Sequence, residues 1–423
     1  MMKVLIVNTS EQTGGAAVAA NRLKDALNNN GIEANMLVRD KLSDDTTVFT
    51  IKNGWRTQWN KLWERWCIFW HLHFSKRNLF AIDIGNAGTD ITQLQAFKDA
   101  DVVHLAWINQ GMLSLKGIEK ILKTGKPLVW TMHDIWPATA VCHITLDCRQ
   151  FETQCKDCRL LPSGIGRNLA RRTWKRKEVI ERRSHIIYIT CSKWLQGEAK
   201  RSALIGQNLI ECIPNPIDTN VFCKADKAEA RRKLGLPTDK RLILFASQRV
   251  TNQNKGMDYL VDACRKMVEQ HPETLANTAV VVLGGHAEDL RENFDLPMFP
   301  LGYVSDTQQI VDVYNAIDVF VLPSLSDNLP NTIMEAMACG VPCVGFEVGG
   351  IPEMIDHEHN GYVVKMKDSA DLAYGINWVL NVADYGKLSA NAVEKVKQCY
   401  SQTHVAMQYI DIYKRAVAYS KNK

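Results

Sequence analysis

The sequence predicts an α/β protein with two Rossmann-like, doubly wound domains. Short apolar segments rich in β-branched residues alternate with longer helical patterns along the whole chain, which is typical of parallel sheets covered by helices on both faces. The chain has 423 residues, more than a single hydrophobic core usually supports. Hydrophobic residues make up 46% of it and charged residues 23%, so there is enough apolar surface for two packed cores.

Eight strands are expected, four in each half of the chain. Each is a short apolar run that ends in a polar or glycine-containing turn, and together they cover residues 4–7, 102–106, 128–131, 186–190, 242–246, 279–283, 319–322 and 342–346. In open α/β sheets the ligand binds beyond the carboxyl ends of the strands. Two such domains facing each other are therefore expected to bind a ligand in the cleft between them.

The boundary between the domains is expected at residues 213–218, with the sequence IPNPID. Its two prolines prevent a helix and favour an extended connection. We therefore predict one domain over residues 1–212 and a second over residues 213–395. Residues 396–423 are expected to form a last helix, because apolar residues recur at helical spacing in this part of the chain.

Charge and hydropathy limit the class of protein. The formal net charge of +5 is too weakly basic to indicate nucleic acid as a partner, but it suits an anionic substrate or an anionic membrane surface. No apolar segment approaches the ~20 residues that a transmembrane helix requires. The first ten residues, MMKVLIVNTS, predict a strand rather than a signal peptide, so a cytoplasmic location is expected.

A glycine pair follows the first predicted strand. Gly14 and Gly15 open the next helix, where glycines let backbone N–H groups approach a phosphate or a sugar, and the amino end of the helix adds positive potential. The alternative is a structural loop that binds nothing.

A basic loop follows the first strand of the second half. It carries Arg249 and Lys255 within the sequence RVTNQNKG. Two fixed cations at the carboxyl end of a strand would stabilise the charge of a departing nucleoside diphosphate. The alternative is a pair of solvated surface charges.

An acidic segment begins at Asp327 and continues into a predicted helix that contains Glu335. Pro330 fits the first helical position, so the helix would direct its first N–H groups at a bound anion. Glu335, about two turns on, is placed to accept hydrogen bonds from a ribose diol. The structural alternatives are an N-cap at Asp327 or Asn328 and an exposed helix-face residue at Glu335.

Taken together, these motifs resemble glycosyltransferase family 4. The resemblance rests on Asp327 with seven residues between it and Glu335, on the following segments AMACGVPCV and GGIPEMI, on the basic loop that ends in Lys-Gly, and on the proline-containing crossing. It covers nearly the whole chain. It implies retaining enzymes with the GT-B architecture, an N-terminal domain that binds the acceptor, a second domain that binds the nucleotide sugar, and a last helix that returns to the first domain.

The resemblance also implies roles for individual residues. Glu335 corresponds to the acid that holds the nucleotide ribose, and Asp327 to the acid that contacts the donor sugar. Arg249 and Lys255 correspond to the diphosphate clamp, and His133 to an active-site histidine near the reacting sugar. The remaining residues expected to bind the donor are Gly14, Gly15, Asn328, Leu329, Pro330, Asn331 and Thr332.

The expected activity is transfer of a sugar, with retained anomeric configuration, from a nucleotide-diphosphate sugar to a glycan or lipid-linked glycan in capsular, exopolysaccharide or related surface-glycan biosynthesis. Catalysis is expected to need no cofactor. One alternative is a GT-B nucleotide-sugar epimerase. Another is a sugar-nucleotide-binding protein without catalysis, because Asp327 stands where many relatives have glutamate.

Four cysteines fall within a short segment of the first half. Cys142, Cys148, Cys155 and Cys158 end in a Cys-x2-Cys pair, and four thiolates close together in a reducing compartment favour a structural zinc site. The alternatives are ordinary thiols or a redox pair.

Five tryptophans recur at helical spacing and form one stripe, at Trp55, Trp59, Trp63, Trp66 and Trp70. Such a stripe is usually part of a core, but the interface of a bilayer also favours tryptophan next to basic residues. A basic run, RRTWKRK at residues 171–177, suits the same anionic surface. The alternative for this run is a solvated helix face. The bilayer alternative predicts a peripheral protein on the inner face of the cell membrane.

Overall fold

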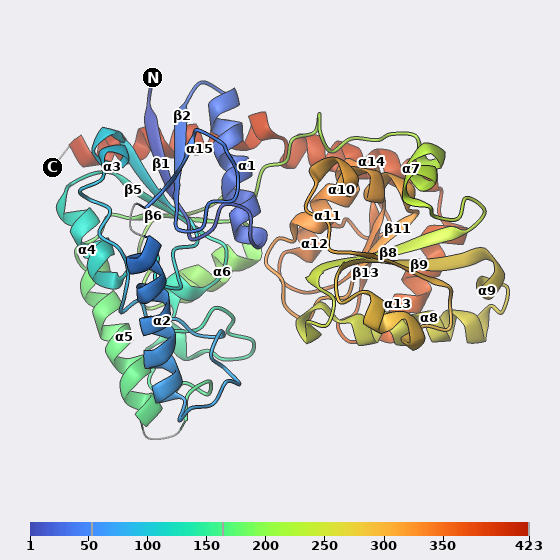
Figure 1. The fold of residues 1–423 in the computed structure, drawn as a ribbon, viewed down its shortest axis with the longest axis horizontal. Coiled ribbons are helices and arrows are strands. Elements are labelled where there is room, and N and C mark those ends of the chain that lie inside the picture. The colour runs from blue at the N-terminus through green and yellow to red at the C-terminus, as the bar shows by residue number, and fades with distance from the viewer. Residues whose placement is uncertain (52–53, 163–164, 422–423) are drawn as a thin grey trace. The chain divides into compact units, whose positions relative to one another are not determined.

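The computed structural model describes residues 1–51, 54–162 and 165–421. The chain divides into two compact units. Unit 1 comprises Met1–Pro216 and Val405–Lys423, and unit 2 comprises Ile217–His404. Each unit has a parallel sheet with helices on both of its faces (Figure 1), so the prediction of α/β architecture with two doubly wound sheets is confirmed.

The sheet of unit 1 has seven parallel strands in the order β3-β2-β1-β4-β5-β6-β7. Their bounds are β1 Lys3–Val7, β2 Glu33–Val38, β3 Val48–Thr50, β4 Val102–Leu105, β5 Leu128–Met132, β6 Ile187–Thr190 and β7 Ile210–Cys212. The strand order reverses between β1 and β4. Ligands of such sheets bind at this reversal, beyond the carboxyl ends of the strands.

Helices cover both faces of this sheet and form two separate cores. One core lies between the sheet and α1 and α15, and the other between the sheet and α3, α4, α5 and α6. The helices of unit 1 are α1 Gly15–Asn29, α2 Gly54–His71, α3 Gln95–Asp99, α4 Leu115–Lys123, α5 Ile165–Glu181, α6 Lys193–Arg201 and α15 Gln402–Lys421, with short 3-10 turns η1 Trp136–Ala138 and η2 Gln150–Glu152.

The helix α15 is held in unit 1 by buried polar contacts as well as by apolar packing. His104 Nδ1 shares a 2.7 Å hydrogen bond with the Tyr413 hydroxyl, and the Thr131 hydroxyl lies 2.9 Å from that of Tyr409. Burial lowers the pKa of His104 to about 3. The imidazole is therefore neutral at physiological pH and bonds its partners as a neutral group.

The sheet of unit 2 has six parallel strands in the order β10-β9-β8-β11-β12-β13. Their bounds are β8 Arg241–Arg249, β9 Thr278–Gly285, β10 Met298–Gly302, β11 Val319–Leu322, β12 Cys343–Phe346 and β13 Gly361–Val364. The helices are α7 Lys227–Leu234, η3 Gln253–Lys255, α8 Met257–Gln270, α9 Thr274–Asn277, η4 Glu288–Asn293, α10 Thr307–Ala316, α11 Asn331–Ala338, α12 Ile351–Met354, α13 Ser369–Asn377, the π-helical η5 Trp378–Val382, and α14 Tyr385–Cys399.

All eight predicted strands are present within a few residues of their expected bounds. The structure adds β2, β3, β7, β10 and β13, which the sequence analysis did not identify. The compact units divide after Pro216 and after His404, whereas the predicted boundaries follow residues 212 and 395. None of the helices in the described ranges combines the length and the apolar character needed to span a bilayer.

The tryptophan stripe lies on α2, as one helix, but it is not part of a core. All five tryptophans on this helix are exposed, from 48% for Trp63 to 80% for Trp55. The core alternative is therefore wrong. The physical reason is that α2 directs Glu64 and Arg65 inward, where Glu64 accepts backbone N–H groups and Arg65 pairs with Asp83 and donates to the carbonyl oxygen of Leu79.

Candidate functional site

In unit 2, the basic loop lies at the carboxyl edge of the sheet. It runs from the end of β8 through η3 to the start of α8. Gly256 has a φ of 73°, and a β-carbon there would overlap the carbonyl oxygen of Pro323, just after β11. The backbone N–H of Leu325 donates to the carbonyl oxygen of Asn254 at 2.8 Å. The loops after β8 and β11 are therefore held against each other.

Lys255 and Asp327, one from each loop, form a direct ion pair. Lys255 Nζ lies 2.6 Å from Asp327 Oδ2, and both side chains are partly buried. The structure thus brings together two residues that the sequence analysis assigned to the donor site. Arg249 also lies on this edge, at the end of β8, and is exposed.

The helix α11 starts at the acidic loop. Its first residue is Asn331, and Pro330 is the cap residue with extended ψ of 118°. The expectation that Pro330 is the first helical residue is therefore wrong by one position, because the carbonyl of Pro330 already accepts the N–H of Ile333 while its own backbone stays extended. The positive end of the helix still lies at this loop.

Glu335 is buried on α11, with 8% of its surface exposed. Its Oε2 accepts a 2.9 Å hydrogen bond from the hydroxyl of Tyr314, which is itself buried on α10. The alternative that Glu335 is an exposed helix-face residue is wrong. The sequence analysis missed Tyr314, because a tyrosine on the apolar side of a helix looks like an ordinary core residue.

A third loop reaches the same edge after β12. Gly349 has a φ of 58°, and a β-carbon there would overlap the carbonyl oxygen of Asp327. Only glycine fits both this backbone conformation and this close approach. The first glycine of the GGIPEMI segment, Gly349, therefore packs against the backbone of Asp327 and helps to fix its position.

In unit 1, the loops after β1 and β4 meet at the carboxyl edge of the sheet. Gly14 is the cap residue of α1 with a φ of 95°, and Gly15 is its first residue. Asn8 Oδ1 accepts the backbone N–H of Trp107 at 2.7 Å. The Thr9 hydroxyl donates to the carbonyl oxygen of Asn109 at 2.8 Å.

His133 follows β5 directly and is half-buried. Its Nδ1 lies 3.5 Å from the Cys191 sulfur, and the residue lines a small pocket together with His104, Thr131 and Tyr409. Burial lowers the pKa of His133 to about 4, although the charge of Asp134 opposes this shift. A neutral imidazole at this position offers one hydrogen-bond donor and one acceptor.

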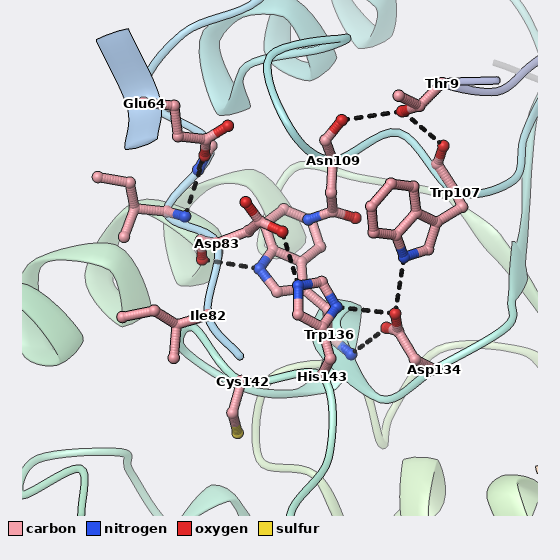
Figure 2. A network of polar contacts seen from close by, with 12 residues as sticks. Thr9, Glu64, Ile82, Asp83, Trp107, Asn109, Asp134, Trp136, Cys142 and His143 are labelled. Atoms are coloured by element: carbon pink, nitrogen blue, oxygen red, sulfur yellow. Dashed lines mark hydrogen bonds and ion pairs between the residues drawn. The ribbon is translucent and has the colours of Figure 1, made fainter. Parts of the chain in front are cut away.

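A polar network surrounds Asp134, the residue after His133 (Figure 2). His143 bonds two carboxylates at once, Asp134 through Nδ1 at 2.8 Å and Asp83 through Nε2 at 2.6 Å. His143 therefore links the two carboxylates through its two ring nitrogens. Trp107 Nε1 donates to the same Asp134 oxygen at 2.8 Å.

The pKa of Asp134 is lowered by this environment. Burial acts to raise it, but the charge and hydrogen bond of His143, the backbone N–H of Trp136 and the indole of Trp107 together leave it below its usual value. Nearby, Asn109 Nδ2 is buried and has no hydrogen-bond partner within the described residues. Across the ranges that the structure describes, this amide is an unpaired buried donor beside the network, and nothing in the sequence distinguished it.

The four clustered cysteines are free thiols in unit 1. Burial, with a smaller contribution from the neighbouring Cys158, Cys155 and Cys148, raises the pKa of Cys142 to about 12. The four side chains therefore share one neighbourhood. Across residues 1–51, 54–162 and 165–421, no three His, Cys, Asp or Glu side chains converge closely enough to hold a metal ion, so the zinc site stays a prediction.

These features define a two-unit α/β protein with cationic, acidic and glycine loops at the carboxyl edges of its sheets. Two family models match the chain, "Glycosyltransferase Family 4" over residues 13–221 and "Glycosyl transferases group 1" over residues 240–382. The chain belongs to this family, the group 1 glycosyltransferases of family 4. The predicted resemblance is confirmed.

Individual proteins agree with this assignment. An uncharacterized glycosyltransferase of Methanocaldococcus jannaschii is 32% identical over 240 residues, which is 54% of this chain and 60% of that protein. The chain spans about half the length of the other curated relatives that it matches.

Two solved structures resemble it over nearly their whole length and have the GT-B fold. Sucrose-phosphate synthase of Thermosynechococcus elongatus has a TM-score of 0.69 at 19% identity, with 99% of this chain and 100% of that chain covered. HepE of Anabaena in complex with UDP-glucose has a TM-score of 0.64 at 17% identity, with 98% and 100% covered.

Proposed function

We propose that this protein is a retaining glycosyltransferase, which transfers a sugar from a nucleotide-diphosphate sugar to a glycan or lipid-linked glycan. The observation that carries the proposal is the ion pair between Lys255 and Asp327, 2.6 Å apart beside the amino end of α11. A cation, a carboxylate and a positive helix end at one strand edge suit a diphosphate and the sugar attached to it. The UDP-glucose bound to the Anabaena neighbour is consistent with such a donor.

In this proposal, unit 2 binds the donor. Glu335, positioned by Tyr314, accepts hydrogen bonds from the ribose diol, while Lys255 and Arg249 bind the diphosphate. Residues 328–332 contribute backbone groups at the start of α11. Asp327 bonds sugar hydroxyls once the phosphates compete for Lys255. The chain supplies positioned charges rather than a covalent nucleophile.

The proposed reaction keeps the anomeric configuration. The bond between the sugar C1 and the leaving phosphate oxygen breaks, and the acceptor oxygen forms its bond to C1 on the same face. The acceptor hydroxyl gives its proton to the leaving phosphate. No cofactor or metal ion enters these steps. We assign to His133 a hydrogen bond with the donor sugar, and to Gly14 and Gly15 backbone contacts with it.

We propose surface-glycan assembly, such as capsule or exopolysaccharide synthesis, as the process that uses this transfer. The acceptor would then be a growing, lipid-linked glycan at the inner face of the cell membrane, and the protein a peripheral one. Asn109, with its buried amide donor, is our candidate contact for the acceptor hydroxyl.

A donor screen followed by product analysis tests the proposal. Nucleotide sugars are first ranked by the rise in Tm that they cause, since a ligand that binds only the folded state stabilises it. The donor with the largest rise is then incubated with a soluble glycan acceptor, and the anomeric linkage is read by NMR. Transfer with retention is expected. Inversion would refute the mechanism, epimerised or free sugar alone would indicate the epimerase, and binding without turnover would indicate an inactive binding protein.

A further inference from the structure

The helix α2 has its polar and apolar faces reversed relative to an ordinary surface helix. Its buried residues are Thr57, Glu64, Arg65 and Ile68, so three of the four are polar or charged. A surface helix normally buries its apolar stripe and exposes its charges. The reversal in α2 requires a physical reason on each face.

The inner face is fixed by hydrogen bonds. Glu64 Oε1 accepts the backbone N–H groups of Gly85 at 2.7 Å and Ile84 at 3.1 Å. Arg65 forms an ion pair with Asp83 and donates to the carbonyl oxygen of Leu79 at 2.5 Å. A rotation of the helix that buried the tryptophans would carry Glu64 and Arg65 to the surface. Their buried partners, the N–H groups of Ile84 and Gly85 and the carboxylate of Asp83, would lose these bonds at a high energetic cost.

Close backbone packing fixes the helix as well. Gly111 has a φ of 80°, and a β-carbon there would overlap the backbone of Lys61 and Asn60. The helix thus lies directly against the loop after β4. Its outer face is therefore a permanent surface of the folded protein.

The outer face carries exposed aromatic side chains along its length. Rings contact each other along it, with Trp55 stacked on Trp59 at a centroid distance of 6.4 Å, and Phe74 edge-on to Trp70 at 5.3 Å. All of the following side chains are more than 45% exposed, and we call them the aromatic patch: Trp55, Trp59, Leu62, Trp63, Trp66, Trp70, Phe74 and Phe80. A patch of this kind on a folded protein marks a docking surface.

The charges around the patch select its partner. Glu64 is the only acidic residue among residues 54–82, and it is buried. The neighbouring helix α5 packs beside α2 (Figure 1). The exposed basic residues of the two helices and the segment after α2 are Arg56, Lys76, Arg77, Arg171, Arg172, Lys175 and Arg176.

We call these exposed basic residues the basic rim. We propose that the aromatic patch and the basic rim bind the protein to an anionic lipid membrane. Tryptophan rings prefer the headgroup region of a bilayer, and Lys and Arg side chains there are attracted to anionic lipids. A second copy of the chain is disfavoured as the occupant, because a symmetric contact would place one basic rim against another. This inference deepens the proposed location at the membrane, and it does not depend on which sugar is transferred.

Membrane seating would place lipid beside the candidate acceptor site of unit 1. The residues that hold α2 in place, Arg65 and Glu64, contact Asp83 and the segment after it, and Asp83 bonds His143, which bonds Asp134. One chain of polar contacts therefore links the helix that carries the aromatic patch to the loop that follows His133.

Vesicle flotation at low salt tests the proposal with the full-length protein. The vesicles contain either phosphatidylcholine alone or phosphatidylcholine with phosphatidylglycerol. The wild-type protein is expected to float with the anionic vesicles, with an affinity at least about tenfold higher than for neutral ones. The triple variant Trp55→Ser/Trp59→Ser/Trp66→Ser is expected to lose roughly tenfold or more of this affinity.

Matched variants test whether the aromatic patch and the basic rim, rather than any exposed tryptophan or basic residue, cause the binding to vesicles. Trp194→Ser removes a tryptophan that is 40% exposed on α6 of the same unit, and it should leave flotation unchanged. The double reversal Arg171→Glu/Lys175→Glu should weaken anionic binding, whereas Lys387→Glu/Lys397→Glu, on exposed positions of α14, should weaken it less. Equal binding by the wild type and the triple variant would overturn the proposal.

Two further readouts keep the outcomes distinct. The rise in Tm with the best nucleotide sugar should be the same in the wild type and the triple variant, so a loss of donor binding is not mistaken for a loss of membrane seating. Light scattering after size exclusion reports the mass of the protein without vesicles. A wild-type dimer that the triple variant converts to a monomer would assign the aromatic patch to a second copy and refute the lipid proposal.

Discussion

Lys255 and Asp327 form an ion pair that joins two loops of unit 2. The proposed function gives Lys255 a diphosphate to bind, and Asp327, 2.6 Å from its Nζ, is the partner that the phosphates would displace. Binding of a diphosphate would loosen the pair and release the carboxylate for a sugar hydroxyl. The short side chain of aspartate keeps the carboxylate close to its own backbone, and Gly349 packs against the carbonyl oxygen of this residue.

Lys255→Met tests the clamp. The substitution keeps most of the side-chain volume and removes the charge, so kcat/KM for transfer should fall by about 100-fold or more. The free energy of unfolding should change by less than about 1 kcal/mol, since the pair is partly exposed. Steady-state kinetics and urea unfolding measure the two quantities. Lys365→Met, outside the site, is the control, and an active Lys255→Met variant would remove the clamp assignment.

Tyr314→Phe tests the support of Glu335. The variant removes the 2.9 Å hydrogen bond to Oε2 and should lower the free energy of unfolding by about 1 kcal/mol. If Glu335 binds the ribose, the KM for the donor should rise several-fold with little change in kcat. Tyr303→Phe, at an exposed position, should change neither quantity. An unchanged KM for the donor would argue against the ribose role of Glu335.

At the scale of elements, the contact between His104 of β4 and α15 makes the stability of unit 1 depend on pH. The pKa of His104, which bonds Tyr413 of this helix, is lowered by burial to about 3. Between that value and about 6.5 the unfolded chain binds a proton that the folded chain does not. The free energy of unfolding should therefore fall as the pH drops below about 6.5, by up to about 1.4 kcal/mol per pH unit from this residue.

His104→Gln checks this origin. Urea unfolding of unit 1, followed at several pH values between 7.5 and 4.5, should show a shallower loss of stability in the variant than in the wild type. His286→Gln, at an exposed position, should leave the pH dependence unaltered. Parallel curves for wild type and His104→Gln would show that other groups cause the acid sensitivity.

The cysteine cluster gives a second prediction at this scale. If Cys142, Cys148, Cys155 and Cys158 bind zinc, freshly purified protein should contain about one zinc per chain, and a chelator should lower its Tm. The variant Cys155→Ser/Cys158→Ser should contain none, whereas Cys223→Ser, exposed in unit 2, should keep the metal. Elemental analysis that finds no stoichiometric zinc in the wild type would show that this prediction is wrong.

Local sequence patterns were sufficient to predict the central strands, which are buried apolar runs such as β1 and β11. Three of the five strands that were missed are very short or contain a proline. β3 and β7 have three residues each, and β10 contains a proline. The motifs at the strand ends were visible in the sequence. Their packing was not, because Tyr314, Gly349 and Asn109 gain their roles only from contacts with residues far away in the chain.

The outward direction of the tryptophans was equally hidden. Periodicity identifies which residues share a face of α2, but the direction of that face depends on Glu64 and Arg65. Their partners, the backbone of Gly85 and the carboxylate of Asp83, lie beyond the helix in the chain. When either face of a helix could be buried, contacts with other parts of the chain decide which face points inward.

At the scale of the whole molecule, unit 1 is discontinuous, with its last helix encoded after unit 2. Val405, Tyr409, Ile412 and Tyr413 of this helix are buried. Burial of each large apolar side chain contributes about 1.5–3 kcal/mol, so their sum is comparable to the entire stability of a domain.

Removal of residues 405–423 should therefore unfold unit 1 and leave unit 2 folded. Hydrogen exchange should show protection only in residues 217–404. A control that lacks residues 420–423 alone should resemble the wild type. A truncated protein with full protection in β1 and β5 would contradict this prediction.

The same arrangement imposes an order on biosynthesis. Translation delivers all of unit 2 between the two pieces of unit 1, and at roughly 5–20 residues per second this interval lasts about 10 to 40 s. During that time the face of β1 and β5 that α15 later covers stays open to water and to other nascent chains. The sheet of unit 2 comes from one continuous segment and is free to fold first. The sheet of unit 1 completes its second core only when α15 has left the ribosome.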